Sequence, residues 1–125
     1  MANDTQVLTP RLDYRPVEER ITDFDEACLG FSPQAARMEA SRCIHCPAPQ
    51  PCMLGYPLHN DVPAAMLEIA EGNFLEAAAV FRQTSNFPEL CGRLCPDELL
   101  CARPCPVGEF DPGIRVGRLE AFVAD

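Results

Sequence analysis

Seven of the eight cysteines in this 125-residue chain fall into two groups with short spacings. The groups are Cys43-x2-Cys46-x5-Cys52 and Cys91-x3-Cys95-x5-Cys101-x3-Cys105. Proline directly follows three of these cysteines and directly precedes two of them. Because proline fixes φ and has no N–H, the chain turns sharply around each sulfur. Loops of this kind point several thiolates at one small inorganic core, so we expect ligands of iron–sulfur clusters.

Two other uses of so many cysteines compete with this interpretation. A disulfide framework is typical of secreted proteins, but the first residues have neither the basic nor the apolar segment of a signal peptide. Structural zinc is the stronger rival, because Cys43-x2-Cys46 is also a zinc half-site. The second group fits zinc less well, since its gaps of three and five residues differ from the usual gap of two.

Length, charge and hydropathy narrow the classes of function. A chain of 125 residues predicts one domain that depends on its metal sites for part of its stability. The net charge of −9 argues against nucleic acid and anionic membranes as partners. The longest apolar run, Ala77–Phe81, is far too short to span a membrane. We therefore expect no membrane insertion and a cytoplasmic location, where thiols stay reduced and available to metal.

The pattern of residues predicts an N-terminal arm followed by an all-α domain. Residues 1–25 carry two prolines and mixed charges without periodicity, so we expect an extended arm that becomes ordered on a partner surface. Residues 26–125 contain no alternating apolar run long enough for a strand. Ser32 and Pro33 begin a helix that ends near Arg42, immediately before the first cysteine group.

An αα-hairpin is predicted between the two cysteine groups. Its first helix covers residues 64–71 and ends at Gly72, and its second covers residues 74–84. Apolar residues recur at spacings of three and four, so the apolar faces pack over the cysteine-rich loops and keep water from them. Residues 87–106 are predicted as loop with one helical turn at 97–100, and residues 116–123 as the last helix.

Five motifs follow one another in a specific order. They are Ala40-Ser-Arg-Cys-Ile-His-Cys46, Pro57-Leu-His-Asn-Asp-Val-Pro63, Glu71-Gly-Asn-Phe-Leu-Glu-Ala77, Asn86-Phe-Pro-Glu-Leu-Cys-Gly-Arg-Leu-Cys-Pro96 and Gly117-Arg-Leu-Glu-Ala-Phe122. In these motifs the chain, over about residues 30–125, resembles the N-terminal iron–sulfur domain of the glutamate synthase small subunit. The same domain begins dihydropyrimidine dehydrogenase. The resemblance implies a small all-α domain that holds two [4Fe–4S] clusters on two cysteine-rich loops.

The resemblance also implies which side chains bind each cluster. The first cluster takes Cys43, Cys46, Cys52 and Cys105. The second takes Cys95, Cys101 and Glu120, together with a fourth cysteine of the first group. Cys91 matches a family cysteine that is usually not a ligand.

This chain departs from the family pattern at one ligand of the second cluster. Tyr56 stands four residues after Cys52, where the fourth cysteine of the first group is expected. The loss of a thiolate leaves three outcomes open: no second cluster, recruitment of Cys91 or His59, or a phenolate ligand. Because the three other matched ligands survive, we expect a second cluster with Tyr56 or Cys91 nearest the open iron.

The family's domain passes single electrons between flavin domains and a catalytic partner. The chain has no G-x-G-x-x-G phosphate loop and no evident nucleophile or general base, so we expect it not to be catalytic alone. We expect an electron-transfer subunit, separate and not excised, whose partners are flavin- or iron–sulfur-containing subunits of an oxidoreductase complex. The alternative is a structural interaction module that zinc or one cluster holds together without carrying electrons.

Overall fold

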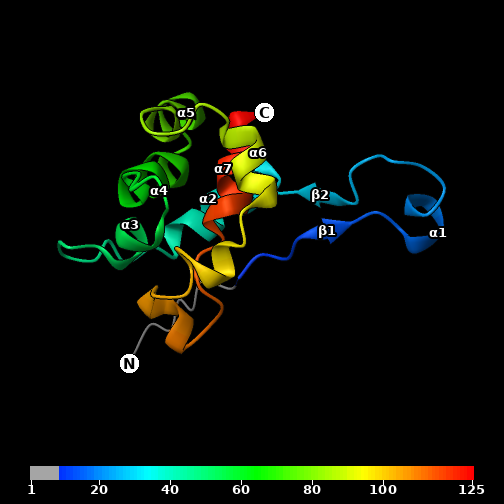
Figure 1. Cartoon of the computed structure of the whole chain (residues 1–125). Helices are drawn as coiled ribbons and strands as arrows, with labels where there is room; N and C mark the ends of the chain where they lie inside the picture. The colour runs from blue at the N-terminus through cyan, green and yellow to red at the C-terminus, as the bar shows by residue number, and fades with distance from the viewer. Residues whose placement is uncertain (1–8) are drawn as a thin grey trace.

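Short helices and 3-10 turns surround the two cysteine groups in the computed structural model, which describes residues 9–125 (Figure 1). The helices are α1 (Val17–Arg20), α2 (Pro33–Ser41), α3 (Pro51–Gly55), α4 (Val62–Glu71), α5 (Phe74–Arg82), α6 (Pro88–Leu94) and α7 (Val116–Ala124). The 3-10 turns are η1 (Asp97–Leu99) and η2 (Pro106–Glu109). The predicted helical fold class is therefore confirmed, with one small sheet added to it.

The predicted helix before Cys43 and the predicted αα-hairpin are both present. The Ser32 hydroxyl accepts a hydrogen bond from the Ala35 N–H at 3.1 Å and caps α2. Asp61 caps α4 in the same way, through the Ala64 N–H at 3.1 Å. Gly72 ends α4 with a φ of 90°, a left-handed conformation that glycine adopts without a steric penalty. Helices α4 and α5 then pack against each other as the two arms of the hairpin.

Helices α3 and α6 occupy segments that the sequence predicted as loops. In both helices proline stands at a first-turn position, Pro51 in α3 and Pro88 in α6. Proline is tolerated there because that position has no intrahelical partner for its N–H. The prediction was wrong at these segments because it read every proline near a cysteine as a sharp turn. The cysteines Cys52 and Cys91 therefore lie on helices and have fixed directions.

Two short strands that the sequence did not predict bring the N-terminal segment back onto the domain. β1 (Asp13–Tyr14) pairs antiparallel with β2 (Cys28–Gly30), and Leu12 packs against the core. Strands of two and three residues are too short for an alternating pattern to show. Residues 1–8 of the expected arm lie outside the described residues, and docking of residues 1–25 on a partner stays a prediction.

The core lies where α2, α4, α5 and α7 meet. Its largest fully buried apolar side chains are Met66, Ile69, Phe81 and Leu119. Helices α6 and α7 run side by side (Figure 1) and make the most extensive helix–helix contact of the domain. None of the helices described between residues 9 and 125 combines the length and apolar composition needed to cross a lipid bilayer.

Gly92 allows the close approach of α6 to α7. A Cβ atom at this position would lie 2.5 Å from the Gly117 carbonyl oxygen and 2.5 Å from the Ala121 nitrogen. Both are backbone atoms, so they move only if the helices separate.

We expect Gly92→Ala to lower the free energy of unfolding by about 1–3 kcal/mol or more, the usual range for overpacking a core. Urea denaturation measures this loss. Gly108→Ala is the matched control, because its Cβ would meet nothing closer than 3.7 Å. Equal stability of the two variants would contradict the proposed packing constraint.

Candidate metal centre

The four cysteines predicted for the first cluster line one cavity. Cys43 and Cys46 lie in the loop after α2, Cys52 lies in α3, and Cys105 directly precedes η2. The cavity contains about 440 Å³ of space not filled by atoms, part of it open to solvent. Apart from cysteines, its wall is apolar and consists of Ile44, Pro51, Val62, Pro63, Met66, Pro106, Val107, Ile114 and Val116. The fold thus brings together thiols that are far apart in sequence.

A fifth cysteine reaches the same cavity. Cys101 is buried and lines its wall, although the family resemblance assigned it to the second cluster. Gly55 makes this approach possible, because a Cβ there would lie 2.6 Å from the Leu100 carbonyl oxygen. The segment that carries Cys101 is therefore held directly against α3.

Burial favours the protonated form of two of these thiols, Cys43 and Cys52. Burial raises the pKa of Cys43, and negative charge on Cys105 or Cys46 raises it further. Burial also raises the pKa of Cys52 to about 11, with added repulsion from Cys43 and Cys105. The geometric observation is that all four thiols line the same cavity. Metal binding must displace their protons, because the thiolate is the ligand.

The four thiols do not form a ready-made site for a single metal ion. Within residues 9–125, no three His, Cys, Asp or Glu side chains lie close enough to share one metal ion. Zinc would draw four sulfurs to about 2.3 Å from one centre, whereas a 4Fe–4S cluster puts each cysteine on a different iron. Four thiols on the wall of one cavity are compatible with the cluster that the family resemblance implies. All eight cysteines are free, so the disulfide alternative gains no support.

Tyr56 and Glu120, both considered for the second cluster, bind each other. Tyr56 follows α3 and is 5% exposed, and Glu120 lies in α7 and is 1% exposed. The Tyr56 hydroxyl donates a hydrogen bond of 2.7 Å to Glu120 Oε1. Burial, followed by the hydrogen bond to Glu120, raises the pKa of Tyr56 far above its usual range. The phenol is therefore neutral at physiological pH.

The other candidates for the second cluster lie around this pair. Cys91 and Cys101 are close enough to Tyr56 for their negative charge to raise its pKa. The pKa of Cys95 is raised by burial and then by Asp97 and Glu120. The fold thus gathers the predicted second set in one region. Arg93, Arg115 and Arg118 line the surface cavity of Cys95, but the groups that raise the pKa of its thiol are acidic or thiolate groups. These charges oppose the formation of a further thiolate there.

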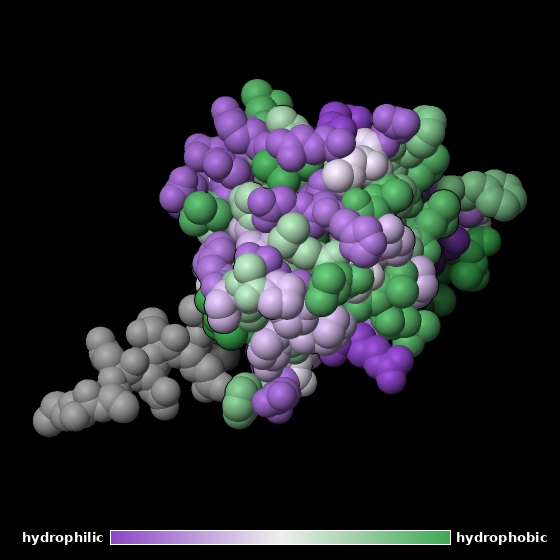
Figure 2. All heavy atoms as spheres, turned by 60° about the vertical axis from the view of Figure 1, so that its left-hand side comes forward, coloured by the Kyte–Doolittle hydropathy of each residue, from purple (hydrophilic) through white to green (hydrophobic). Residues whose placement is uncertain are grey.

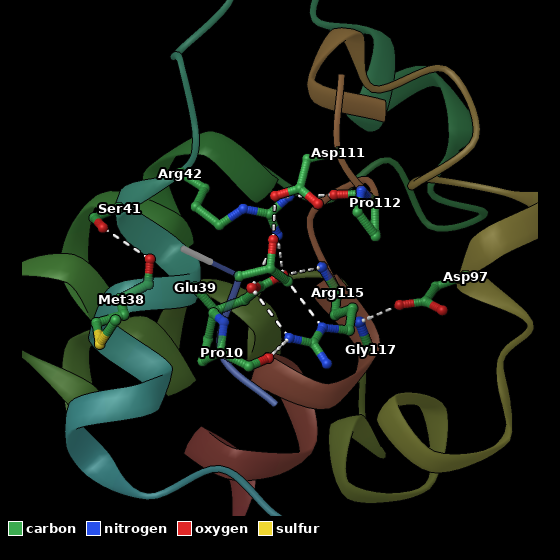
Figure 3. A network of polar contacts seen from close by, with 11 residues as sticks. Pro10, Met38, Glu39, Ser41, Arg42, Asp97, Asp111, Pro112, Arg115 and Gly117 are labelled. Atoms are coloured by element: carbon green, nitrogen blue, oxygen red, sulfur yellow. Dashed lines mark hydrogen bonds and ion pairs between the residues drawn. The ribbon is translucent and has the colours of Figure 1, made fainter. Parts of the chain in front are cut away.

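A buried ionic network connects the end of α2, just before Cys43, to the start of α7 (Figure 3). The Glu39 carboxylate in α2 is fully buried and accepts two hydrogen bonds from Arg42 Nη1, at 2.8 and 2.9 Å. The backbone N–H of Arg115 donates to Glu39 Oε1 at 2.9 Å, and the Arg115 guanidinium pairs with the same carboxylate at 3.3 Å. Glu39 therefore joins the residue before Cys43 to the start of α7.

The two arginines extend this network to other segments. Arg42 Nη2 donates to the Pro112 carbonyl and pairs with Asp111 at 3.4 Å, which fixes the turn after η2. Arg115 Nη2 donates to the Pro10 carbonyl, and its guanidinium lies 5.0 Å from the centre of the Phe31 ring. These contacts fix the segments that carry Cys43 and Cys105 relative to α7.

The sequence prediction missed Glu39. A signal was present, because Glu39 stands three residues after Ala36 and next to Ala40 on the buried face of α2. A carboxylate on an apolar helix face, with arginine three residues later, indicates a buried ion pair. The family motifs drew attention to the cysteines and away from this position.

Comparison with known proteins agrees with this geometry. A protein-family profile described as dihydropyrimidine dehydrogenase domain II, 4Fe–4S cluster, matches residues 20–125. The chain is 38% identical to UacF of Escherichia coli over 86% of this chain and 17% of that protein. It is 35% identical to the glutamate synthase [NADPH] small chain of Halomonas elongata, over 89% of this chain and 23% of the relative.

A third relative is the NAD-dependent dihydropyrimidine dehydrogenase subunit PreT of Salmonella typhimurium, which is 37% identical over 81% of this chain and 24% of the relative. The chain therefore spans about a fifth of the length of the curated relatives that it matches. The similarity concerns a domain of these proteins and covers nearly all of the present chain.

We expect Glu39→Gln to lower the free energy of unfolding by about 3–5 kcal/mol, because it leaves two arginines without a buried counterion. Thermal or urea denaturation measures the change. Glu76→Gln is the matched control, since Glu76 is exposed on α5, and its effect is expected within about 0.5 kcal/mol. Similar losses in both variants would show that the network does not support the domain.

Glu120 is expected to make stability depend on pH. Burial raises its pKa to about 7, above the usual 4.5, so the unfolded chain loses this proton at lower pH than the folded chain. The free energy of unfolding therefore falls as pH rises from about 4.5 to 7.

Glu120→Gln removes this dependence, so the loss of stability between pH 5 and pH 8 is expected to be about 2–3 kcal/mol smaller than in the parent chain. Urea denaturation at both pH values, on samples of equal iron content, measures the difference. Parallel pH profiles of parent and variant would exclude Glu120 as the source.

Proposed function

Since this chain belongs to the family of dihydropyrimidine dehydrogenase domain II, the 4Fe–4S cluster domain, we propose that it relays single electrons within an oxidoreductase complex. The observation that carries the proposal is the convergence of Cys43, Cys46, Cys52 and Cys105 on one apolar cavity. These four are the residues that the family pattern assigns to a cluster with four thiolate ligands. No residue of the cavity wall offers a nucleophile for substrate chemistry other than the thiols themselves.

We assign the four thiols as ligands of one [4Fe–4S] cluster, which takes up and releases one electron when bound. The residues around the cluster have a different role from that of its ligands. Val62, Met66 and Val116 close the inner wall of the cavity and exclude water from it. Solvent exposure and nearby charge set the reduction potential of a cluster, so this apolar wall is part of the function.

Exposed apolar residues next to the cavity provide a surface for a protein partner. Ile44, in the cavity wall, is 63% exposed, and Phe110, after η2, is 91% exposed. Apolar side chains also reach the solvent on the face that carries α3 and α4 (Figure 2). A partner that covers this region comes close to the ligated thiols. We propose flavin- or iron–sulfur-containing subunits as the partners. We also propose that the chain works in a reducing compartment such as the cytoplasm, where its thiols stay free.

The names of the relatives support the proposed complex. Two of them are a glutamate synthase small chain and a dihydropyrimidine dehydrogenase subunit, so each is one part of a larger enzyme. The alternative, a structural module held together by metal, requires the same thiols but no change of oxidation state. Reversible reduction of the isolated chain separates the two functions, because a redox-silent metal supports only the module.

We expect Cys46→Ser to remove most of the bound iron and to lower the thermal unfolding midpoint, because cluster binding is coupled to folding. Iron and acid-labile sulfide per chain, together with calorimetry, measure both effects. Cys28→Ser is the matched control. Cys28 is a buried thiol of β2 that lines a different cavity, so this variant is expected to keep its iron.

Two results would overturn the assignment. Iron content and stability of Cys46→Ser equal to those of the parent chain would exclude Cys46 as a ligand. Zinc in the parent chain, with no reversible reduction, would replace electron transfer by the structural alternative.

A further inference from the structure

The two predicted cluster sites differ in how their side chains are arranged. At the first site, four thiols from three segments face one cavity with an apolar wall, and they fit a cluster. At the second site, two positions that the family pattern assigns to a cluster, 56 and 120, bind each other. The Tyr56 hydroxyl donates to Glu120 Oε1 at 2.7 Å, and the pair is almost completely buried.

Tyr56 is fixed in this position by its surroundings. Its backbone N–H donates to the Cys52 carbonyl at 2.8 Å, and its ring lies 6.5 Å from the ring of Phe81 in the core. A phenol ring is much larger than the thiol that it replaces, and here it belongs to the packed core of the domain. Glu120 likewise faces inward from α7.

The remaining thiols of the second set lie in one region but line different cavities. Cys101 lines the first cavity. Cys95 lines a surface cavity whose charged residues are Arg93, Asp97, Glu98, Arg115 and Arg118. Cys91 lies with its sulfur 3.6 Å from the Ser85 hydroxyl, within hydrogen-bond reach. His59, the other alternative ligand, is exposed and has Nδ1 3.1 Å from the Met53 carbonyl oxygen.

Charged groups of both signs lie beside Cys95, because Arg93, Arg115 and Arg118 line the same surface cavity as Asp97 and Glu98. Asp97 accepts a hydrogen bond from the Gly117 N–H at 2.9 Å and so is held beside Cys95 at the start of α7. A cluster with thiolate ligands is an anion. At the first site, Arg42 and Arg115 pair with Glu39 next to the loop that carries Cys43.

We propose that this chain binds one [4Fe–4S] cluster and that the buried Tyr56–Glu120 hydrogen bond replaces the second. This inference rests on the proposed function, which supplies the first cluster. The hydrogen bond connects the end of α3 to α7, the same two segments that a second cluster would connect. The domain therefore keeps this connection without metal.

Iron stoichiometry tests the proposal in the full chain, purified without oxygen and reconstituted with iron and sulfide. The parent chain is expected to hold about four irons and to show a single reduction step. Tyr56→Cys restores the missing thiolate and frees Glu120, so it is expected to hold about eight irons and to show two reduction steps. Tyr56→Phe removes only the hydroxyl, so it is expected to keep about four irons with a lower thermal unfolding midpoint.

The outcomes separate this proposal from the proposed function. About eight irons in the parent chain would overturn the single-cluster proposal and leave the electron relay intact. About four irons in a folded Tyr56→Cys chain would also overturn it, since Tyr56 would not be the residue that excludes the cluster. No iron in the parent chain would overturn the proposed function itself. If Tyr56→Cys does not fold, the number of irons in the parent chain and the thermal unfolding midpoint of Tyr56→Phe still test the proposal.

Discussion

The rest of the structure depends on the burial of one carboxylate, that of Glu39. A buried charge is costly unless it is paired and hydrogen-bonded, and Glu39 meets this requirement only when Arg42 and Arg115 both reach it. Arg42 directly precedes Cys43, and Arg115 begins α7. The position of the first cysteine loop is therefore tied to that of the last helix. A displacement of either one would leave charge unpaired in the core, which makes the arrangement close to all-or-none.

The metal centre combines two opposing requirements. Its thiols must be buried in an apolar wall to be shielded from water, yet the same burial raises the pKa of Cys43 and Cys52 and opposes the thiolate form. Metal resolves this conflict, because coordination to iron stabilises the thiolate that burial disfavours. The free energy of cluster binding is thus also part of the free energy of folding. Under the proposed assignment, cluster binding and stability depend on the same four side chains.

Much of the fold was predictable because its signals are local. Ser32-Pro33, Gly72 and the apolar periodicity of α4 and α5 each act within a few residues. The helices α3 and α6 were missed, because proline is compatible with a helix start as well as with a turn. The Tyr56–Glu120 hydrogen bond spans 64 residues, and the Glu39–Arg115 contact spans 76. No local pattern encodes such a pairing. The family resemblance grouped Cys105 with the first three cysteines and position 56 with Glu120, but it did not indicate a direct hydrogen bond between Tyr56 and Glu120.

The cavity of the first site also determines when its thiols become available together during synthesis. Its wall combines Cys43, Cys46 and Cys52 with Cys105, more than fifty residues later in the chain. The ribosome delivers the chain from the N-terminus, so three thiols emerge long before the fourth. During that interval they are exposed to oxidation and to competing metal ions. If the four thiols bind one cluster, as we propose, the complete set of ligands is available only after nearly the whole domain has emerged, so cluster insertion is a late step.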